Sequence, residues 1–534
     1  MKISMNPRRI IFATAVFLVL FYNRAFFRNV LSAYPLSWHT AGFLFSQVIV
    51  LTTLLVFLFS LLSWKRTLKP LLILVVLLSS FAAYFMDTYG LIIDWTMIQN
   101  GVETNVNEAS DLLGFKLAAY FIFLGLLPSL VIFNISIVYG SLKRELMAKG
   151  MTLGLSLLVI VGTLGIYSAS YASFFREHKA LRYYTNPTYF IYAFGQYLGN
   201  RRESNTPPVL TSIGLDAKIS EGDLDRELIV LVVGETARAD RFSLNGYAKK
   251  TNPRLEKEGV VSFRSFYSCG TSTAVSVPCL FSFYKKSEYS EDKRESTENI
   301  LDVLKRAGVN VLWRDNNSDS KGVALRVAYQ DFRTAELNPI CDIECRDIGM
   351  LSGLQEHIDR VKEKDILIVL HQMGNHGPAY YKRYPESFEA FGPACRSIEL
   401  RDCSALEIDN AYDNAILYTD YFLSEVVALL KRNDARFETA LFYVSDHGES
   451  LGENNLYLHG LPFLFAPDEQ KHVGAIMWFG DSYIIDRAKV IAKENLPYSH
   501  DHIFHTLLGF MEVGTAVYDP GQDILSDAYS GPHS

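Results

Sequence analysis

The sequence predicts an α-helical membrane domain followed by an α/β domain. Two observations lead to this prediction. Apolar residues crowd into the first third of the 534-residue chain, in stretches long enough to cross a bilayer as helices. From residue 226 onward, short continuous apolar runs alternate with helical patterns, which is typical of a largely parallel sheet covered by helices.

Five apolar stretches are the predicted transmembrane helices of a domain at residues 1–175. Most approach or exceed the roughly 20 residues that a membrane-spanning helix needs. The first is the weakest, because Asn23 and Arg24 interrupt its end. A cleaved signal peptide is the alternative there, but no small-residue cleavage site follows and further spans do. The stretches are 10–27, 41–64, 70–94, 113–139 and 151–175.

The charges of the short loops predict the orientation of these helices. Basic loops lie on the cytoplasmic side of a membrane, and an odd number of spans then places everything after residue 175 outside the cytoplasm. The loop at 99–111 carries acidic residues and no base. The basic groups are Lys2, Arg8 and Arg9, then Lys65, Arg66 and Lys69, then Lys143, Arg144 and Lys149.

The six cysteines all follow residue 268, in the part predicted to be exported. An even set confined there indicates disulfides in an oxidising compartment. Six cysteines allow 15 connectivities, so pairing between sequence neighbours is only the simplest prediction. A zinc ribbon is the alternative, but spacings of ten, four and eight do not fit its paired knuckles. The pairs are Cys269 and Cys279, Cys341 and Cys345, and Cys395 and Cys403.

Residues 176–225 are interpreted as a connector between the two domains. Tyrosines and arginines mixed with apolar residues suit a segment on the membrane interface, or an amphipathic helix packed on the exported domain. The stretch "ESNTPPVLTS" indicates a flexible link. The formal charge of −7 and the lack of a long basic stripe argue against a nucleic-acid partner.

Residues 226–534 carry the alternating pattern of the α/β domain. Continuous apolar runs predict strands buried on both faces. Ligands of such sheets bind at the carboxyl ends of the strands, so the residues that follow each strand are candidates for chemistry. Strands are predicted at "ELIVLVVGE", "VNVLWRDN", "DILIVLHQMG", "TALFYVSDHGES" and "VGAIMWFG", and helices at "TENILDVLKRAG", "GLQEHIDRVKE" and "EIDNAYDNAILYTDYFLSEVVALLKR".

Carboxylates and imidazoles follow these strands on four segments. Glu235 follows the first strand, His376 stands in "NHGP", Asp446 and His447 stand in "SDHGES", and His459 stands in "YLHG". Each of these motifs alone is usually a helix cap or a solvated surface group. Their coincidence at one edge of one sheet favours a metal centre, because carboxylate oxygens and imidazole nitrogens are zinc ligands.

Zinc lowers the pKa of a bound hydroxyl and so makes it a nucleophile. A threonine of "SCGTSTAVSVPCLFS" (residues 268–282) would supply that hydroxyl. Gly448 would allow the sharp turn that lets Asp446 and His447 bind one metal. The pattern therefore predicts a metal-dependent hydrolase or transferase.

Five motifs resemble the phosphoethanolamine transferases of Gram-negative bacteria, which modify lipid A and include the mobile colistin-resistance enzymes. The motifs are "VVGETARADRFSLNGY", "CGTSTAVSVPC", "NHGP", "YDNAILYTD" and "SDHGESLGENNLYLHG". The resemblance spans essentially the whole chain. It implies five spans in the inner membrane and a periplasmic domain that is sulfatase-like and related to alkaline phosphatase, with its catalytic centre at 226–534.

The resemblance also implies roles for individual residues. Thr273 would be the nucleophile, and one tightly bound Zn²⁺ would be held by Glu235, Thr273, Asp446 and His447. His376 and His459 would bind a second zinc in some states and contact the phosphate or the leaving group. The headgroup positions would be Ser318 and Lys321 after the second strand, and Asn100, Thr104 and Glu108, whose spacing places them on one helix face. Lys321 would also be catalytic, because with zinc it would stabilise the equatorial oxygens of the phosphate.

The implied reaction is transfer of phosphoethanolamine from phosphatidylethanolamine to a phosphate of lipid A, by a chain expected to act as a monomer. Thr273 would carry the group between the two lipids. One alternative is a related transferase whose acceptor is a lipopolysaccharide core sugar, a periplasmic glucan or a protein. Others are a glycerol-phosphate transferase of the lipoteichoic acid type, and a non-catalytic membrane protein with a decayed domain.

Overall fold

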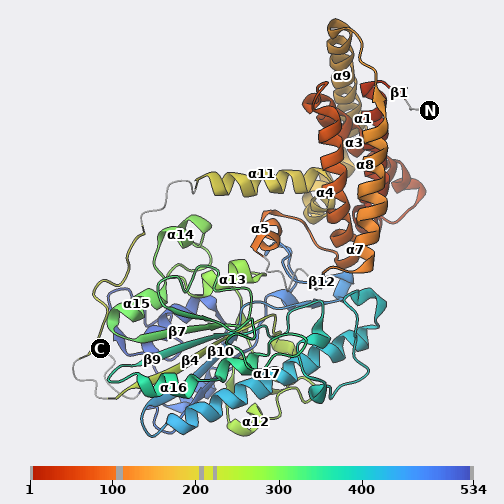
Figure 1. Ribbon diagram of the computed structural model, residues 1–534. Helices are drawn as coiled ribbons and strands as arrows, with labels where there is room; N and C mark the ends of the chain where they lie inside the picture. Colours follow the sequence, from red (N-terminus) through yellow and green to blue (C-terminus); the bar gives the residue numbers. More distant parts are fainter. Residues whose placement is uncertain (1–3, 104–111, 204–209, 221–224, 530–534) are drawn as a thin grey trace. The chain divides into compact units, whose positions relative to one another are not determined.

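The computed structural model describes residues 4–103, 112–203, 210–220 and 225–529. The chain forms two compact units (Figure 1). The first comprises Met1–Ile98 and Leu112–Asn200, and the second comprises Gln99–Asp111 and Arg201–Ser534. Of the three headgroup positions predicted at 100–108, Asn100 lies in helix α5 (Trp95–Glu103), whereas Thr104 and Glu108 lie outside the described residues.

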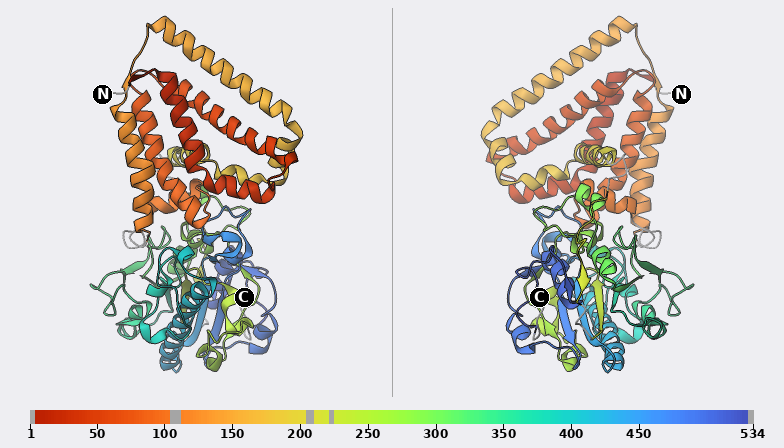
Figure 2. Two further views of the ribbon diagram at one scale, coloured as in Figure 1. Left: turned by 90° about the vertical axis from the view of Figure 1, so that its right-hand side faces the viewer. Right: turned by 90° about the vertical axis from the view of Figure 1, so that its left-hand side faces the viewer.

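The first unit is helical, as the sequence predicts (Figure 2). Four of its described helices are long and apolar enough to cross a membrane, and a bent pair at the N-terminus makes five if the pair is one span. The pair is α1 (Pro7–Tyr22) and α2 (Arg24–Ala33), bent by 60°. The four are α3 (Trp38–Leu62), α4 (Leu68–Tyr89), the span Phe115–Asn134 (α7, Phe115–Tyr120; η1, Phe121–Leu126; α8, Leu127–Asn134) and α9 (Leu142–Ile166).

The bend between α1 and α2 falls at Asn23, the residue that weakened this span in the sequence. The Asn23 side chain donates to the carbonyl of Asn186 at 2.7 Å and accepts from the Asn186 main-chain N–H at 2.9 Å. Asn186 also donates to the carbonyl of Ser79 in α4 at 3.0 Å. The interruption therefore forms a buried polar joint between segments that lie 163 positions apart.

Shorter elements complete the first unit and lead out of it. Strand β1 (Ser4–Met5) pairs in parallel with β2 (Ser136–Ile137). Most of the predicted connector that the structure describes is helical, in α10 (Ser168–Glu177), η2 (Lys179–Tyr184) and α11 (Thr188–Glu203).

The second unit is built on a seven-stranded sheet of order β5-β13-β10-β4-β9-β7-β8. Strands β10, β4, β9, β7 and β8 are parallel, and β13 and β5 are antiparallel to their neighbours, so the predicted largely parallel sheet is confirmed. All five predicted strands are present, and the sequence missed the two edge strands. The strands are β4 (Glu227–Gly234), β5 (Val261–Ser262), β7 (Asn310–Asp315), β8 (Ala328–Asp331), β9 (Ile366–His371), β10 (Glu438–Ser445) and β13 (Ala475–Phe479).

Helices cover both faces of this sheet (Figure 1). The long helix α17 lies on one face, and α15 and α19 pack with α13 into the hydrophobic core on the other. Local signals start and stop these helices: Ser404 and Glu407 form a capping box at the start of α17, and Gly308 ends α15 with a left-handed φ of 109°. The helices are α12 (Leu255–Glu258), α13 (Thr273–Leu280), α14 (Glu291–Ser296), α15 (Ile300–Ala307), α16 (Leu354–Arg360), α17 (Ala405–Asn433), α18 (Arg487–Ala492) and α19 (Ile503–Phe510).

Small ribbons and three disulfides tie the loops of the second unit. The ribbons pair β11 (Ser450–Leu451) with β12 (Tyr457–Leu458), β14 (Tyr498–Ser499) with β6 (Phe266–Tyr267), and β15 (Val513–Gly514) with β3 (Lys218–Ile219). The disulfides join Cys269 to Cys279, Cys341 to Cys345 and Cys395 to Cys403, which is the neighbour pairing.

Candidate metal centre and active site

Two neighbouring parallel strands deliver the acidic residues of the site. Glu235 follows β4 directly, and Asp446 follows β10, whose Ser445 pairs with Gly234. The Asp446 main-chain N–H donates to the Gly234 carbonyl at 3.0 Å, which continues the pairing by one residue. Both carboxylates are completely buried, so adjacent strands fix two negative groups side by side at one edge.

Two glycines let other backbone segments approach these strands. Gly374, in the loop of His376, has a φ of 52°, and a Cβ there would lie 2.9 Å from the Glu235 carbonyl oxygen. A Cβ on Gly448 would lie 2.1 Å from the carbonyl oxygen of Glu469. Close approach of the 469 segment therefore requires glycine at position 448, and the predicted role of Gly448 in a turn at Asp446 and His447 stays a prediction.

Thr273 is brought to the same edge by the start of α13. Its Oγ1 lies 3.1 Å from Glu235 Oε2 and 3.3 Å from His447 Nε2. The hydroxyl therefore sits at a helix N-terminus, where main-chain N–H groups favour negative charge. The neighbouring Thr271 hydroxyl donates instead to the Leu461 carbonyl at 2.7 Å, and Ser272 occupies the N-cap position.

The group formed by Glu235, Asp446 and His447 fits a metal ion. His447 Nε2 lies 3.5 Å from Glu235 Oε1 and 3.4 Å from Asp446 Oδ2. Both of these carboxylate oxygens are buried and have no hydrogen-bond partner among the described residues. Buried anionic oxygens of this kind are costly unless they are paired or coordinate a cation. Two carboxylates, an imidazole and a hydroxyl form a donor set that suits zinc.

A second group of possible ligands shares Glu235 with the first. One ligand atom from each of Glu235, His376 and His459 lies within 4.8 Å of the others. The ring centroids of His376 and His459 are 5.4 Å apart, and those of His447 and His459 are 4.3 Å apart. The structure thus brings together every sequence-predicted residue that follows β4, β9 and β10.

Burial and mutual charge set the protonation of these groups. Burial, together with the neighbouring Asp446 carboxylate, raises the pKa of Glu235 to about 7, and burial raises the pKa of Asp446 to about 6. Burial and the nearby His459 lower the pKa of His447 to about 4. Burial opposes the charged form of His459 as well, yet the Glu449 carboxylate raises its pKa to about 9. His447 is therefore neutral near pH 7, and a cation bound beside Glu235 and Asp446 would favour the charged form of both carboxylates.

Ser318 and Lys321 lie in the loop that follows β7. Lys321 Nζ donates to the Ser318 carbonyl at 3.1 Å, and the Lys321 main-chain N–H donates to Asp319 Oδ1 at 2.6 Å. Both residues are largely buried. The loop reaches the metal group through Asn317, whose side chain donates to Glu235 Oε2 at 2.8 Å.

Comparison with known proteins identifies the family. A profile of the sulfatase family matches residues 227–513, and one described as phosphoethanolamine transferase EptA/EptB matches residues 51–202. The chain is 42% identical to the phosphatidylethanolamine transferase Mcr-2 of Escherichia coli over 96% of each chain, and 38% identical to phosphoethanolamine transferase EptA of E. coli K12 over 98% of this chain and 97% of that one. The chain belongs to the phosphoethanolamine transferases.

A solved structure extends this family likeness to the fold. The integral membrane lipooligosaccharide phosphoethanolamine transferase A of Neisseria meningitidis superposes with a TM-score of 0.95, at 33% identity, over 99% of this chain and 100% of that chain. The predicted membrane domain followed by a sulfatase-like domain is therefore confirmed. Membership in this family favours phosphoethanolamine over glycerol phosphate as the transferred group.

Several polar residues around the candidate metal centre of this phosphoethanolamine transferase were not predicted from the sequence. Asn317 holds Glu235, and Glu449 holds His459 with 2.7 Å between Oε2 and Nδ1. Beneath them, Asp315 and His371 form a buried pair with 2.9 Å between Oδ2 and Nδ1. Asp315 and His371 are the last residues of β7 and β9, and Asn317 follows β7 by two residues. The rule that ligands bind at the carboxyl ends of strands would have identified all three. Glu449 stands in "SDHGES", but no sequence pattern indicated that it pairs with His459.

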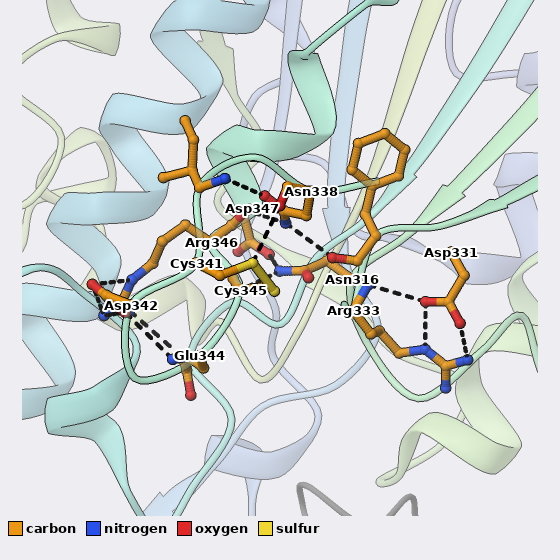
Figure 3. The surroundings of a disulfide bond; sticks show 12 residues. Asn316, Asp331, Arg333, Asn338, Cys341, Asp342, Glu344, Cys345, Arg346 and Asp347 are labelled. Atoms are coloured by element: carbon orange, nitrogen blue, oxygen red, sulfur yellow. Dashed lines mark hydrogen bonds and ion pairs between the residues drawn. A yellow bond between two sulfur atoms is a disulfide. The ribbon is translucent and has the colours of Figure 1, made fainter. Parts of the chain in front are cut away.

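The buried carboxylate of Asp347 fixes the loop that carries His376. Figure 3 shows Asp347 with Asn316 beside the Cys341–Cys345 disulfide. It accepts hydrogen bonds from the main-chain N–H groups of Met373 at 2.9 Å and Gly374 at 3.0 Å, and from the side chains of Asn316 at 2.8 Å and Gln372 at 3.2 Å. Asp347 lies two residues after the Cys341–Cys345 disulfide. The segment that follows the Cys341–Cys345 disulfide thus holds the loop after β9, which carries His376.

An ion pair adds a further link to the His376 loop. The Arg383 guanidinium donates to the His376 carbonyl at 2.7 Å and pairs with the Glu344 carboxylate, inside the loop closed by Cys341 and Cys345. The disulfide loop therefore contacts the His376 segment through Glu344, and Asp347, just beyond the loop, contacts it as well.

Proposed function

We propose that this chain transfers phosphoethanolamine from phosphatidylethanolamine to a phosphate of lipid A, with Thr273 carrying the group between them. The observation that carries this proposal is the Thr273 hydroxyl, which lies against Glu235 and His447 at the N-terminus of α13. The names of the relatives give phosphatidylethanolamine and lipooligosaccharide as substrates of those enzymes. The lipid A acceptor is taken from the resemblance of the motifs.

Glu235, Thr273, Asp446 and His447 would hold Zn²⁺, and His376 and His459 would complete a second position with Glu235. When bound, zinc favours the ionised hydroxyl and offsets negative charge on the phosphate. The orphaned oxygens of Glu235 and Asp446 support this assignment. One tightly bound ion is the expected content of the purified chain.

In the first step, Thr273 Oγ1 gives up its proton to solvent and forms a bond to the phosphorus of the donor, and the bond from phosphorus to the diacylglycerol oxygen breaks. His459 supplies a proton to that oxygen. Its pairing with Glu449 fixes the ring and favours the protonated form, which suits a general acid. The N-terminal N–H groups of α13 favour the negative oxygens near Thr273.

In the second step, an oxygen of a lipid A phosphate attacks the same phosphorus, and the bond to Thr273 breaks. Thr273 Oγ1 and His459 then take up protons from solvent, which restores the hydroxyl and the general acid, so one chain turns over with ping-pong kinetics. Ser318 and Lys321 would hold the ethanolamine phosphate of the donor, together with Asn100, Thr104 and Glu108. The added ammonium group lowers the attraction of the lipid surface for cationic peptides such as polymyxin.

The division into a membrane domain (1–175), a connector (176–225) and a catalytic domain (226–534) belongs to the same proposal. We place the membrane domain in the inner membrane of a Gram-negative cell and the catalytic domain in the periplasm, acting as a monomer. The basic short loops and the disulfides of the second unit support this placement.

Mass spectrometry of lipid A tests the proposal. Cells that express the chain should produce lipid A with one added phosphoethanolamine, and cells that express Thr273→Ala should not. Ser272→Ala is the matched control, because it removes the adjacent hydroxyl and should leave the modification in place. Phosphoethanolamine on core sugars, glucans or protein, with lipid A unmodified, would overturn the assignment of the acceptor.

A further inference from the structure

A cavity of about 300 Å³ lies within the first unit, and none of the residues that line it belongs to the transfer site. Its walls come from the start of α1, the end of α3, the start of α4 and the first turns of α9. This volume is at the lower limit for ligand pockets, which is enough for a headgroup but not for a whole lipid.

The charged residues of the cavity favour an anion. Arg8, Lys65 and Lys149 line it, with Glu145 as the single carboxylate. Glu145 Oε1 accepts a hydrogen bond from the main-chain N–H of Gly140 at 2.7 Å.

Lys149 is already engaged, because its Nζ donates to the carbonyls of Leu61 and Ser63, both at 3.1 Å, and lies 4.0 Å from the centre of the Trp64 ring. The end of α3 is thereby capped by a cation.

Arg8 and Lys65 are the two cations left to a ligand. In the described part of the chain, neither forms an ion pair with a carboxylate, and the nearest aromatic partner of Lys65 is Tyr139, at 5.9 Å from Nζ to the ring centre. Ser60 adds a polar atom to the cavity wall. Its side chain is 3% exposed, and its hydroxyl has no hydrogen-bond partner among the described residues.

Ile11, Leu68, Leu142 and Leu146 contribute aliphatic side chains to the walls, beside the hydroxyls of Ser63 and Thr152. Cations and a hydroxyl beside aliphatic side chains fit a ligand with an anionic head and hydrocarbon chains. Free phosphate or a soluble phosphate ester would leave the aliphatic walls without a partner. The end of the unit that carries these residues also carries the basic loops, which are predicted to lie in the cytoplasm.

We propose that this cavity binds the phosphate and glycerol backbone of an anionic glycerophospholipid from the cytoplasmic leaflet. Arg8 and Lys65 contact the phosphate, Ser60 donates its hydroxyl to the head, and the acyl chains leave along Leu142 and Leu146 into the bilayer. Basic pockets between membrane helices on the cytoplasmic side bind such headgroups in other proteins. The ligand differs from the proposed donor in its net charge, and its pocket lies in a different unit from the metal centre.

The test uses the full-length chain in detergent, titrated with phosphatidylglycerol and followed by native mass spectrometry and thermal unfolding. One phosphatidylglycerol should bind per chain and raise the unfolding temperature, whereas phosphatidylcholine should do neither. In Arg8→Gln/Lys65→Gln, binding should weaken roughly 30-fold, equivalent to about 2 kcal/mol for two lysine or arginine contacts.

Lys143→Gln/Arg144→Gln is the matched control, because it removes the same charge from exposed positions that do not line the cavity. Its affinity should stay within about twofold of the parent value, as expected for charges outside the binding site. Equal weakening in both double variants would overturn the proposal in favour of general surface attraction. Unchanged binding in Arg8→Gln/Lys65→Gln would also overturn it. Equal stabilisation by inorganic phosphate alone would remove the lipid as the ligand.

Discussion

The central sheet has an amino edge, where its parallel strands begin, and a carboxyl edge, where they end. These two edges can be compared within one molecule. Strands β4 and β10 each begin with a glutamate, Glu227 and Glu438, which pair with each other, and each is followed by a carboxylate, Glu235 and Asp446. At the amino edge, Glu512 joins the first two, and carboxylate oxygens of all three lie within 4.8 Å. Both edges thus gather carboxylates, but among the described residues only the group at the carboxyl edge also includes imidazoles and the Thr273 hydroxyl.

The difference comes from the segments that approach each edge. At the carboxyl edge, α13 brings Thr273, and the loops after β9 and β10 bring His376, His447 and His459. Each of these segments is fixed by further hydrogen bonds, disulfides or close glycine contacts. The amino-edge group consists of glutamates alone. Carboxylates at strand ends therefore do not make an active site until other loops supply different chemistry.

The largest expected effect in this comparison is the loss of the nucleophile. Thr273→Ala should lower the rate of transfer to lipid A by at least about 10³-fold, because the variant has no hydroxyl to form the covalent intermediate. Mass spectrometry of the intact chain should detect a phosphoethanolamine adduct in the parent and none in the variant. Thr273→Ser keeps a hydroxyl and should keep measurable transfer. Full transfer by Thr273→Ala would contradict the assigned nucleophile.

Glutamates at the two edges should differ in their effect on metal content. Glu235→Gln should weaken zinc binding at least about 100-fold, because even residues that only support metal ligands cost 10- to 100-fold. Glu512→Gln removes the same charge at the amino edge and should leave zinc content unchanged. Metal analysis of the purified chains after dialysis measures both. Equal zinc loss in the two variants would contradict the location of the centre.

Zinc affinity should depend on pH in the direction set by the raised pKa values of the two carboxyl groups. Below about pH 7 Glu235 takes up a proton in the metal-free chain, and below about pH 6 Asp446 does so. Protons then compete with the metal, so affinity is complete above pH 7 and falls as the pH decreases. The limiting slope is about two decades per pH unit. Competition with a fluorescent chelator from pH 5 to 8 measures it, and a flat profile would contradict the shared carboxylate site.

The smallest expected effect concerns the support of the His376 loop. Asp347→Asn should reduce the stability of the second unit by about 2 kcal/mol, because two main-chain and two side-chain donors lose a charged acceptor. Asp359→Asn is the control elsewhere in the second unit. Asp359 pairs with Arg436, their side chains are 51% and 48% exposed, and exposed pairs contribute only about 0–1 kcal/mol. Thermal unfolding of the full-length chain compares the two, and equal losses would contradict the special role of Asp347.

The sequence predicted the architecture and the residues at the carboxyl edge, because both depend on regular rules. Apolar runs such as that of β4 mark buried strands, and parallel strands bring their carboxyl ends to one edge. It did not predict edge strands β5 and β8, which are short. It also missed Glu449 and Asp347, which stand in irregular loops where no periodic pattern marks a partner: His459 follows Glu449 by ten residues, and the donors to Asp347 lie 25 to 31 residues away. Zinc, the role of Thr273 and the headgroup positions remain predictions.

The polar joint at Asn23 has a consequence for the order in which the membrane unit is assembled. Asn23 is made early, but its partner Asn186 follows 163 residues later, after all of the candidate spans. Until then, the amide at the break between α1 and α2 lacks the partner that it has in the finished fold. The first segment to enter the membrane is therefore among the last to reach its final contacts, and its shape depends on a residue at the far end of the unit.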